Sequence, residues 1–381
     1  MTRIVVTGGG TGGHVFPAIA IADALKKVEP GVEILFVGAE GRLEMERVPR
    51  AGYRIEGLEM AGFDRRRLWR NAAVVLKAWR AREKAKRIVK AFGPDAAVGV
   101  GGYASGPTLS ACRALGVPYL LQEQNGYAGV TNKMLAGGAE RICVAYDGME
   151  RFFPKDKIVM TGNPVRDDLV REETGVAEAR KAFGLAADRA TVLVVGGSLG
   201  AGTINESLMT QLPLVKDSGV QLIWQTGKYY WDDIRARLAE QGEPAGMWAG
   251  PFIDDMGLAY KAASVVVSRA GALSISELCL LGKAAILVPS PNVAEDHQTK
   301  NAMALVRKGA ALCIRDTEAR MALVPRAVQL TQDAEERASL EKNIRQLARP
   351  HAAREIALAV LSMIEKAAEP PIQNSELRIE N

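Results

Sequence analysis

Short, continuous runs of apolar residues recur along the chain, separated by longer segments in which apolar and polar residues alternate with helical spacing. Continuous runs are typical of strands that are covered on both faces of a sheet. Strands alternating with helices favour a parallel, doubly wound sheet, because right-handed crossovers place the helices over its faces. The runs predict strands at residues 3–7, Glu33–Gly38, Ala96–Gly102, Pro118–Glu123, Arg141–Tyr146 and Lys157–Gly162, and again at Thr191–Val195, Val220–Gln225, Ser264–Val267, Ala284–Val288 and Ala310–Ile314.

Two of these strands are followed by a glycine-rich turn and a helix. The first turn spans Gly8–Gly13, and the second spans Gly196–Gly202. Glycines let the backbone turn tightly, and the first turn of the next helix offers unpaired N–H groups to a phosphate. His14 lies at the mouth of the first turn, and Pro17 is expected in the first turn of the helix. Two such units predict an α/β fold with two Rossmann-like domains, each a doubly wound parallel sheet, that face each other across a cleft.

The domain boundaries follow from length and composition. A chain of 381 residues is too long for one average domain. Gly162-Asn163-Pro164 is typical of a linker, so we place the N-terminal domain at residues 1–163 and the C-terminal domain at residues 164–349. A helix at about 350–366 should pack back on the N-terminal domain, and the polar tail at 369–381 is expected to be disordered. Helices are expected near the end of the chain at Glu318–Leu330, Ala334–Leu347 and His351–Lys366.

The composition, with 48% hydrophobic and 24% charged residues, is that of an ordinary soluble protein. The chain begins in a strand without a leader pattern, and no apolar run is long enough to span a bilayer, so we expect a protein that is neither secreted nor integral to a membrane. The cysteines lie far apart in apolar segments, without the spacing of a metal or redox site, and are expected to be buried free thiols in a reducing cytoplasm. They are Cys112, Cys143, Cys279 and Cys313.

Positive charge is concentrated in the segment from Arg65 to Lys90, which contains eleven Lys or Arg and one acid. Its local charge is +10 in a chain whose total is +5, so the rest of the chain sums to −5. Within it, Trp69, Leu76 and Trp79 recur at helical spacing. Such a helix can insert its apolar face into a bilayer interface while its cations contact anionic lipid. The alternative is a solvated helix whose apolar stripe packs on the sheet. RNA binding is a weaker interpretation, because no nucleic-acid motif accompanies the charge.

Gly8–Gly13 also satisfies G-x-G-x-x-G, the pattern of nicotinamide dinucleotide oxidoreductases. Such an enzyme needs an acid at the end of the second strand to bind the ribose, and Glu40, which follows a Gly-Ala turn, is ambiguous in that place. An oxidoreductase does not need a second glycine turn in a second domain. A transferase that binds its donor on one domain and its acceptor on the other does.

Three later polar segments follow predicted strands, at the edge where a doubly wound sheet binds ligands. In SRAGALSISE, Glu277 could accept hydrogen bonds from a sugar, although Ser274-x-x-Glu277 also matches a capping box. In PNVAEDHQTKN, Gln298 could bind a sugar, although Asp296 could simply cap a helix. The third segment, QEQNG at 122–126, has an ordinary turn as its alternative. Together the three segments favour a sugar-binding edge.

The motifs GGGTGGHVFPA, GVGGYASGP, QEQNGYAGVTNK, TGNPVR, GGSLGA, PFIDDM, SRAGALSISE and AEDHQTKNA follow one another over nearly the whole chain. In this set and order, the sequence closely resembles the MurG family of bacterial peptidoglycan glycosyltransferases. The resemblance implies a GT-B fold and inverting transfer of N-acetylglucosamine (GlcNAc) from UDP-GlcNAc to the C4 hydroxyl of the muramoyl sugar of lipid I, forming lipid II. It implies peripheral work at the anionic inner face of the cytoplasmic membrane, without a cofactor or nucleic acid, and with cell-wall synthesis and division proteins as candidate partners.

The resemblance also assigns roles to residues. Ile253 would meet the uracil through its backbone, Glu277 would hold the ribose, and Gln298 the GlcNAc hydroxyls. Two departures stand out. Gln122 occupies a position where many members carry His, which excludes a titrating role there, and Leu199 replaces a residue that is often polar, which argues against a side-chain contact to phosphate. The implied donor contacts are Thr11, Gly12, Gly13, Asn125, Arg166, Ser198, Ile253, Ala272, Leu273, Ser274, Ile275, Ser276, Glu277 and Gln298.

Inverting transfer needs a base for the acceptor proton and a group that stabilises the departing UDP. The chain has no Asp-x-Asp motif for a metal, so helix N-termini, backbone amides and Arg166 are expected to carry that charge. His14 is the first candidate base, because a helix N-terminus disfavours the imidazolium, with a structural role as its alternative. Glu123 is the second candidate base. A UDP-sugar epimerase, a nicotinamide oxidoreductase and a non-catalytic membrane adaptor remain as other classes, and the epimerase would lack the basic segment.

Overall fold

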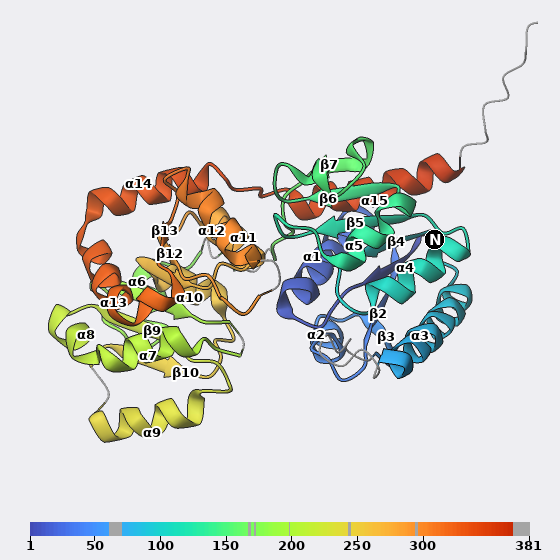
Figure 1. Ribbon diagram of the computed structural model, residues 1–381. Coiled ribbons are helices and arrows are strands. Elements are labelled where there is room, and N and C mark those ends of the chain that lie inside the picture. Colours follow the sequence, from blue (N-terminus) through green and yellow to red (C-terminus); the bar gives the residue numbers. More distant parts are fainter. Residues whose placement is uncertain are drawn as a thin grey trace, which may run out of the picture.

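The chain folds into two α/β domains that lie side by side, shown in the computed structural model of Figure 1. The structure describes residues 1–60, 71–166, 169–170, 173–197, 199–242, 245–293 and 296–368, without the side chains of 71–76, 78 and 366–368. Each domain is built on a parallel sheet with helices over both faces. The predicted architecture of two doubly wound sheets is therefore confirmed.

The N-terminal sheet has seven parallel strands in the order β3-β2-β1-β4-β5-β6-β7. The strand order reverses between β1 and β4, and the loops that follow these two strands therefore flank the place where such folds bind ligands. The strands are β1 Arg3–Thr7, β2 Glu33–Ala39, β3 Arg54–Leu58, β4 Ala96–Gly99, β5 Tyr119–Glu123, β6 Arg141–Val144 and β7 Ile158–Met160. The helices are α1 Gly12–Val28, α2 Glu44–Arg50, α3 Asn71–Phe92, α4 Ser105–Ala114 and α5 Val130–Leu135.

The C-terminal sheet has six parallel strands in the order β10-β9-β8-β11-β12-β13, with its reversal between β8 and β11. Its strands are β8 Thr191–Val195, β9 Gln221–Gln225, β10 Met247–Gly250, β11 Val265–Ser268, β12 Ala285–Leu287 and β13 Leu312–Cys313. Its helices are α6 Val176–Ala182, α7 Gly202–Thr210, α8 Leu212–Ser218, α9 Trp231–Gln241, α10 Met256–Ala262, α11 Ala272–Leu281, α12 His297–Val306, α13 Asp316–Gln332 and α14 Ala334–Arg345.

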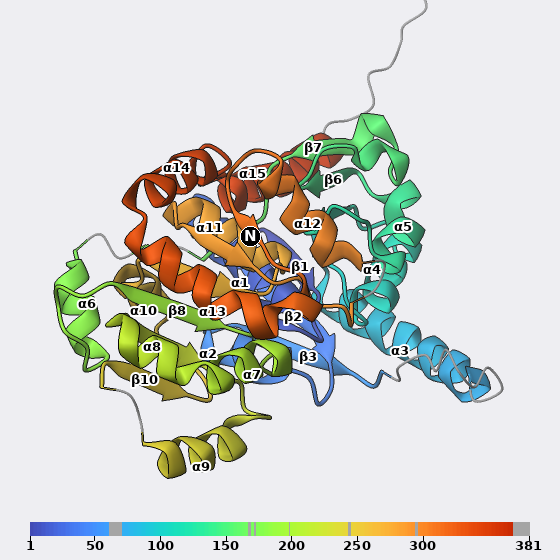
Figure 2. The same cartoon turned by 60° about the vertical axis from the view of Figure 1, so that its left-hand side comes forward.

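The last helix, α15 (Ala352–Ala368), follows the C-terminal sheet in the sequence but packs on the N-terminal domain (Figure 1). Ile356 and Val360 are fully buried in the same apolar cluster as Val15 and Ile21 of α1. The chain therefore passes between the domains twice, once between β7 and α6 and once between α14 and α15. Figure 2, turned by 60°, shows α15 and α14 along the same side of the molecule.

The sequence did not predict the two strands β3 and β10, which lie at the sheet edges. An edge strand has a neighbour on one side only and need not carry the continuous apolar run that marks a buried strand, although β7 and β13 at the opposite edges do. The sequence RIEGL of β3 is largely polar, and MWAG of β10 is short and ends in glycine. The expected place of Pro17 was also wrong. Because α1 begins at Gly12, Pro17 lies in the second helical turn, where its ring removes one N–H from the helical ladder.

Candidate active site

The carboxyl edges of the two sheets face each other, and the loop after β5 contacts helix α12 of the other domain. The N–H of Gly126 donates to Asn301 Oδ1 at 3.4 Å, and the Lys300 ammonium lies 4.6 Å from the centre of the Tyr127 ring. The Arg47 guanidinium lies 5.2 Å from the Phe252 ring across the same boundary. The fold therefore brings together segments that the sequence singled out more than a hundred residues apart.

The first glycine turn packs tightly against the loop after β4. The N–H of Gly9 donates to the carbonyl of Gly101 at 3.3 Å. Gly102 has a φ of +88°, and a Cβ there would lie 2.2 Å from the carbonyl oxygen of Gly9, so only glycine fits. The N–H of Gly10 is already taken, because it donates to the buried Glu44 carboxylate at 2.8 Å. A protein carboxylate thus uses an amide that a bound dinucleotide phosphate would need, which argues against the oxidoreductase alternative.

His14 stands at the start of α1, partly buried, beside the loop after β4. Its Nδ1 lies 3.2 Å from the hydroxyl oxygen of Thr11. A Cβ on Gly101 would lie 3.1 Å from the ring's Nε2, so a residue larger than glycine would crowd the imidazole. Burial lowers the pKa of His14 from 6.5 to about 4. The ring is therefore neutral near pH 7, as the sequence predicts, but burial rather than the helix dipole is the cause.

Glu123 ends β5 and is buried beneath the loop that carries Asn125. Its carboxylate accepts from the N–H of Gly129 at 2.9 Å, from the Asn132 side-chain amide at 2.9 Å and from the N–H of Asn125 at 3.1 Å. Burial raises its pKa, and these hydrogen bonds oppose the rise. The Glu123 side chain thus fixes the conformation of the segment from Asn125 to Asn132.

The linker residue Asn163 joins the two domains through a buried amide network. Its Oδ1 accepts from Gln122 Nε2 at 3.0 Å, and its Nδ2 donates to the carbonyl of Gln124 at 3.1 Å. The same Nδ2 donates to the hydroxyl of Ser276 on α11 at 3.0 Å. Gln122, whose amide does not titrate, is held in this network, and its Oε1 accepts from Gln124 Nε2. Just beyond the linker, the Arg166 guanidinium lies 4.7 Å from the centre of the Phe16 ring of α1.

The second glycine turn follows β8 and is held by Gln225 at the end of β9. Gln225 Nε2 donates to the carbonyl of Gly197 at 3.1 Å, and its Oε1 accepts from the N–H of Ile253 at 2.9 Å. Because the N–H of Ile253 is taken by Gln225, the backbone contact to a uracil that the resemblance implies would have to use the Ile253 carbonyl. Leu199 is 74% exposed, and Ser198 lies outside the described residues.

Helix α11 carries the implied donor contacts from Ala272 to Glu277. It begins at Ala272 after Gly271, which makes no side-chain cap. Ser274 and Glu277 therefore lie inside the helix, and the capping-box alternative for this pair is wrong. Glu277 Oε2 instead accepts from the hydroxyl of Tyr260 at 2.9 Å. This bond holds the Glu277 carboxylate beside α10, the helix that carries Tyr260.

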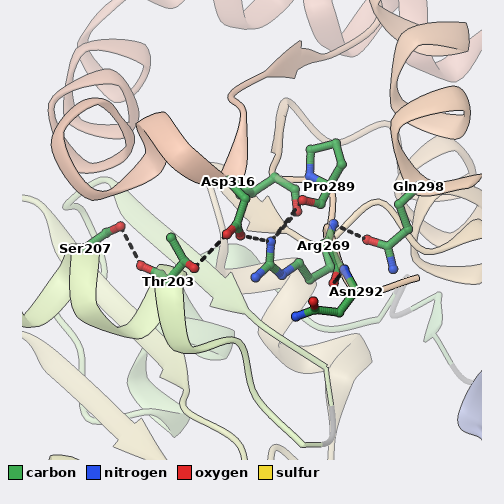
Figure 3. A network of polar contacts seen from close by, with 9 residues as sticks. Thr203, Ser207, Arg269, Pro289, Asn292, Gln298 and Asp316 are labelled. Atoms are coloured by element: carbon green, nitrogen blue, oxygen red, sulfur yellow. Dashed lines mark hydrogen bonds and ion pairs between the residues drawn. The ribbon is translucent and has the colours of Figure 1, made fainter. Parts of the chain in front are cut away.

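A polar network that the sequence did not predict surrounds Arg269, at the end of β11 (Figure 3). Arg269 Nη1 donates to the carbonyls of Val288 and Pro289, each at 3.1 Å, and forms an ion pair with Asp316. The other oxygen of Asp316 accepts from the hydroxyl of Thr203 at 2.8 Å, in the first turn of α7. Arg269 thus links the helix after the second glycine turn to the loop after β12. Asp316 lies 47 residues from Arg269 in the sequence, so no local motif indicates this ion pair.

Gln298 lies in the first turn of α12, next to that loop. Its Oε1 accepts from the N–H of Ser290 at 2.8 Å, which holds the amide against the 289–292 segment (Figure 3). Asp296 precedes the helix with a φ of +49°, and its Oδ1 accepts from the Thr299 hydroxyl at 2.7 Å. It makes no side-chain cap to a helix N–H. The alternative in which the Asp296 side chain caps the helix is therefore wrong.

The basic segment is helical from Asn71 to Phe92, as α3. Its packed side carries Ala81, Ala85 and Val89, which lie in the apolar cluster with β1 and α4. Trp79 is not part of that cluster and is 58% exposed. Trp69 lies outside the described residues, as does the side chain of Leu76. None of the helices that the structure describes is long and apolar enough to cross a bilayer.

The comparisons with known proteins agree with this architecture. Residues 4–144 match the glycosyltransferase family 28 N-terminal domain, and residues 191–356 match the family 28 C-terminal domain. A Bacteroides fragilis protein named UDP-N-acetylglucosamine--N-acetylmuramyl-(pentapeptide) pyrophosphoryl-undecaprenol N-acetylglucosamine transferase is 55% identical over 366 residues, which is 96% of each chain. The Phocaeicola vulgatus protein of the same name is 56% identical, over 96% of this chain and 97% of its own. The crystal structure of Acinetobacter baumannii MurG has a TM-score of 0.73 at 30% identity, covering 95% of this chain and all of that one.

Proposed function

This chain belongs to glycosyltransferase family 28 and to its MurG members, and on that basis we propose that it transfers GlcNAc from UDP-GlcNAc to lipid I, forming lipid II. The observation that carries the proposal is identity above 50% over nearly the full length of relatives named for this reaction. The acceptor is the C4 hydroxyl of the muramoyl sugar, and the transfer inverts the anomeric centre.

The donor site of the proposal lies mainly on the C-terminal domain. The carbonyl of Ile253 would meet the uracil, Glu277 the ribose and Gln298 the GlcNAc hydroxyls. The geometry supports these roles, because Glu277 is not a cap and Gln298 is oriented by Ser290. Arg166 and the backbone of the second glycine turn, including Ser198, would stabilise the departing diphosphate. The donor contacts also include residues 272–276, Asn125 and the segment Thr11 to Gly13.

In the proposed reaction, the acceptor's C4 oxygen attacks the anomeric carbon of GlcNAc while the bond from that carbon to the diphosphate oxygen breaks. UDP leaves with the bonding electron pair, and the acceptor proton passes to a base. His14 can take this proton at Nε2 if Nδ1 carries the ring hydrogen and donates it to Thr11, which lies 3.2 Å away. The lowered pKa supports this role by keeping the ring unprotonated at neutral pH. Glu123, whose oxygens accept hydrogen bonds of 2.9, 2.9 and 3.1 Å, is the second candidate.

The proposed location is the inner face of the cytoplasmic membrane, with peripheral attachment. Support comes from the +10 segment and from Trp79, which is exposed on α3 rather than packed on the sheet. Trp69, Leu76 and Trp79 would enter the interface while the surrounding cations contact anionic lipid. Cell-wall synthesis and division proteins are the proposed protein partners.

A transfer assay tests the function directly. The purified chain is incubated with UDP-GlcNAc labelled in the sugar and a lipid I analogue, and the product is identified by mass. We expect the label in a disaccharide product, one UDP released for each sugar transferred. An epimerase would instead convert UDP-GlcNAc without an acceptor, and release or isomerisation without transfer would overturn the proposal.

A further inference from the structure

A buried carboxylate lies directly beneath the first glycine turn. Glu44 is the first residue of α2 and is 1% exposed. Its Oε2 accepts from the N–H of Gly10 at 2.8 Å, and its Oε1 accepts from the N–H of Ala39 at 3.0 Å. One side chain therefore ties the glycine turn to the end of β2, the neighbouring strand of the sheet.

Two glycines make room for this carboxylate. A Cβ on Gly9 would lie 2.1 Å from Glu44 Oε1, and a Cβ on Gly38 would lie 2.6 Å from Glu44 Cγ. Neither glycine has a positive φ, so the backbone itself does not demand glycine there. The space taken by Glu44 explains both positions. At Gly9, the missing side chain thus leaves space for the Glu44 carboxylate of the protein itself rather than for the phosphate of a ligand.

The residues that follow Gly10 include Thr11, which contacts the candidate base His14 of the proposed mechanism. Thr11 is next in the chain, and its hydroxyl contacts His14 Nδ1. On its other side, the turn contacts the loop after β4 through the longer bond, 3.3 Å, from the N–H of Gly9 to the carbonyl of Gly101. The position of Thr11, and with it the orientation of the imidazole, therefore depends on the anchor that Glu44 provides at Gly10.

We propose that Glu44 is a positioning residue for the transfer, which acts by fixing the first glycine turn so that Thr11 orients His14. This inference rests on the proposed function and adds a residue to it. Glu44 does not touch the substrates in this scheme. It acts through two hydrogen bonds to backbone N–H groups, and both need an acceptor oxygen.

The substitution Glu44→Gln tests this requirement with little change in volume. A carboxamide has one acceptor oxygen and one NH₂ group, so either Gly10 or Ala39 would face a donor instead of an acceptor. We expect the turn to shift and kcat to fall by about 10²-fold, as displacements of roughly 1 Å do at active sites. UDP affinity should change much less than kcat, because the proposed contacts to the uracil and the ribose, at Ile253 and Glu277, lie on the other domain. Glu46→Gln is the matched control, because Glu46 lies on the same helix and pairs with Arg50 at the surface.

A second readout does not depend on activity. The chain has three histidines, so the imidazole resonance of His14 can be assigned with a His14→Ala variant, while His297 and His351 serve as internal controls. We expect Glu44→Gln to move the His14 resonance alone. Gly38→Ala should reproduce the loss of kcat and the shifted resonance, because its Cβ would displace Glu44 without removing it.

A folded Glu44→Gln protein with wild-type kcat would overturn the proposal. So would a fall in activity that only follows the fraction of unfolded protein, with the His14 resonance unchanged, since that is the signature of a purely structural residue. If the wild-type protein showed no transfer, the proposed function would fail, and the histidine spectra would still decide whether Glu44 positions His14.

Discussion

Glu277 shows at the residue scale how helix position decides the role of a carboxylate. It lies beyond the first turn of α11, where no helix N–H is free for it to cap, and its bond to Tyr260 holds it in place. We expect Glu277→Ala to weaken UDP-GlcNAc binding by about tenfold or more, the loss typical of a hydrogen bond to a charged group, with a small change in melting temperature. Calorimetric titration and a thermal melt measure the two effects.

The control for this prediction is Tyr260→Phe, which removes the same intramolecular bond but keeps the carboxylate. If Tyr260→Phe weakens donor binding as much as Glu277→Ala does, Glu277 acts by packing rather than by contacting the donor. Unchanged donor affinity in Glu277→Ala would contradict the ribose contact.

His14 is expected to affect turnover rather than binding. Loss of a general base typically costs 10²–10⁴-fold, so His14→Ala should lower kcat by a factor in that range while UDP affinity stays the same. Steady-state kinetics with both substrates varied, together with UDP titration, separate the two quantities. A variant that keeps more than about a tenth of wild-type turnover would exclude His14 as the base and direct attention to Glu123.

The lowered pKa of His14 also predicts how stability depends on pH. The ring takes up a proton at about 6.5 when the chain is unfolded but only at about 4 when it is folded. Its contribution to stability is therefore complete above pH 6.5 and is lost as the pH falls from 6.5 towards 4. Between pH 7 and 4.5, the wild type should lose at most about 2–3 kcal/mol more than His14→Asn, less if solvent reaches the ring. Urea unfolding at both pH values measures this, and equal losses would show that the ring titrates normally.

At the scale of elements, the sequence predicted what is local and missed what is paired at a distance. The central strands could be predicted because strands buried on both faces read as apolar runs, whereas β3 lies at an edge and does not. The glycine turns and the polar strand ends were also visible. The bond from Gly10 to Glu44 joins residues 34 apart, and no pattern within either segment indicates it. Local spacing even misled, since a capping-box pattern falls inside α11.

Helix α3 carries the membrane prediction at this scale. Its packed side is formed by small and branched residues, including Ala85 and Val89, while Trp79 stays exposed amid cations. We expect binding to anionic vesicles that weakens with salt, because each cation near an anionic surface contributes about 1 kcal/mol, and a blue shift of tryptophan fluorescence on binding. Leu76→Ser with Trp79→Ser should reduce vesicle binding and turnover on lipid-embedded acceptor, but spare activity on a soluble, short-chain acceptor.

The matched control for the helix is Tyr229→Ser, which removes an aromatic residue that is 81% exposed on the C-terminal domain. It should leave vesicle binding unchanged. Equal losses on both acceptors in the double variant would mean that the stripe supports the fold. Unchanged vesicle binding would place the membrane contact elsewhere on the molecule.

At the scale of the whole molecule, the distribution of charge and the path of the chain act together. The described part of the +10 segment, helix α3, lies on the N-terminal domain, so an anionic surface would orient that domain towards the membrane and leave the other domain to bring the nucleotide sugar. The α15 helix, which packs on α1, returns the chain to the N-terminal domain. Productive transfer then requires the two carboxyl edges to keep a defined alignment.

Asn163 contributes directly to that alignment, because it is buried and bonds Gln122 of β5, Gln124 in the loop after it and Ser276 of α11. Asn163→Ala leaves the Gln122 amide and the Ser276 hydroxyl without this partner, so the domains should gain freedom about the linker. Each domain keeps its own core, and UDP affinity should therefore change little, while kcat falls by about tenfold or more through misalignment of the reacting groups. Small-angle scattering should report a broader distribution of interdomain distances. Asn343→Ala, which removes a bond to Gly309 within the C-terminal domain, is the control and should match the wild type. Wild-type kcat in Asn163→Ala would show that the alignment is set elsewhere, at contacts such as that between Gly126 and Asn301 of α12.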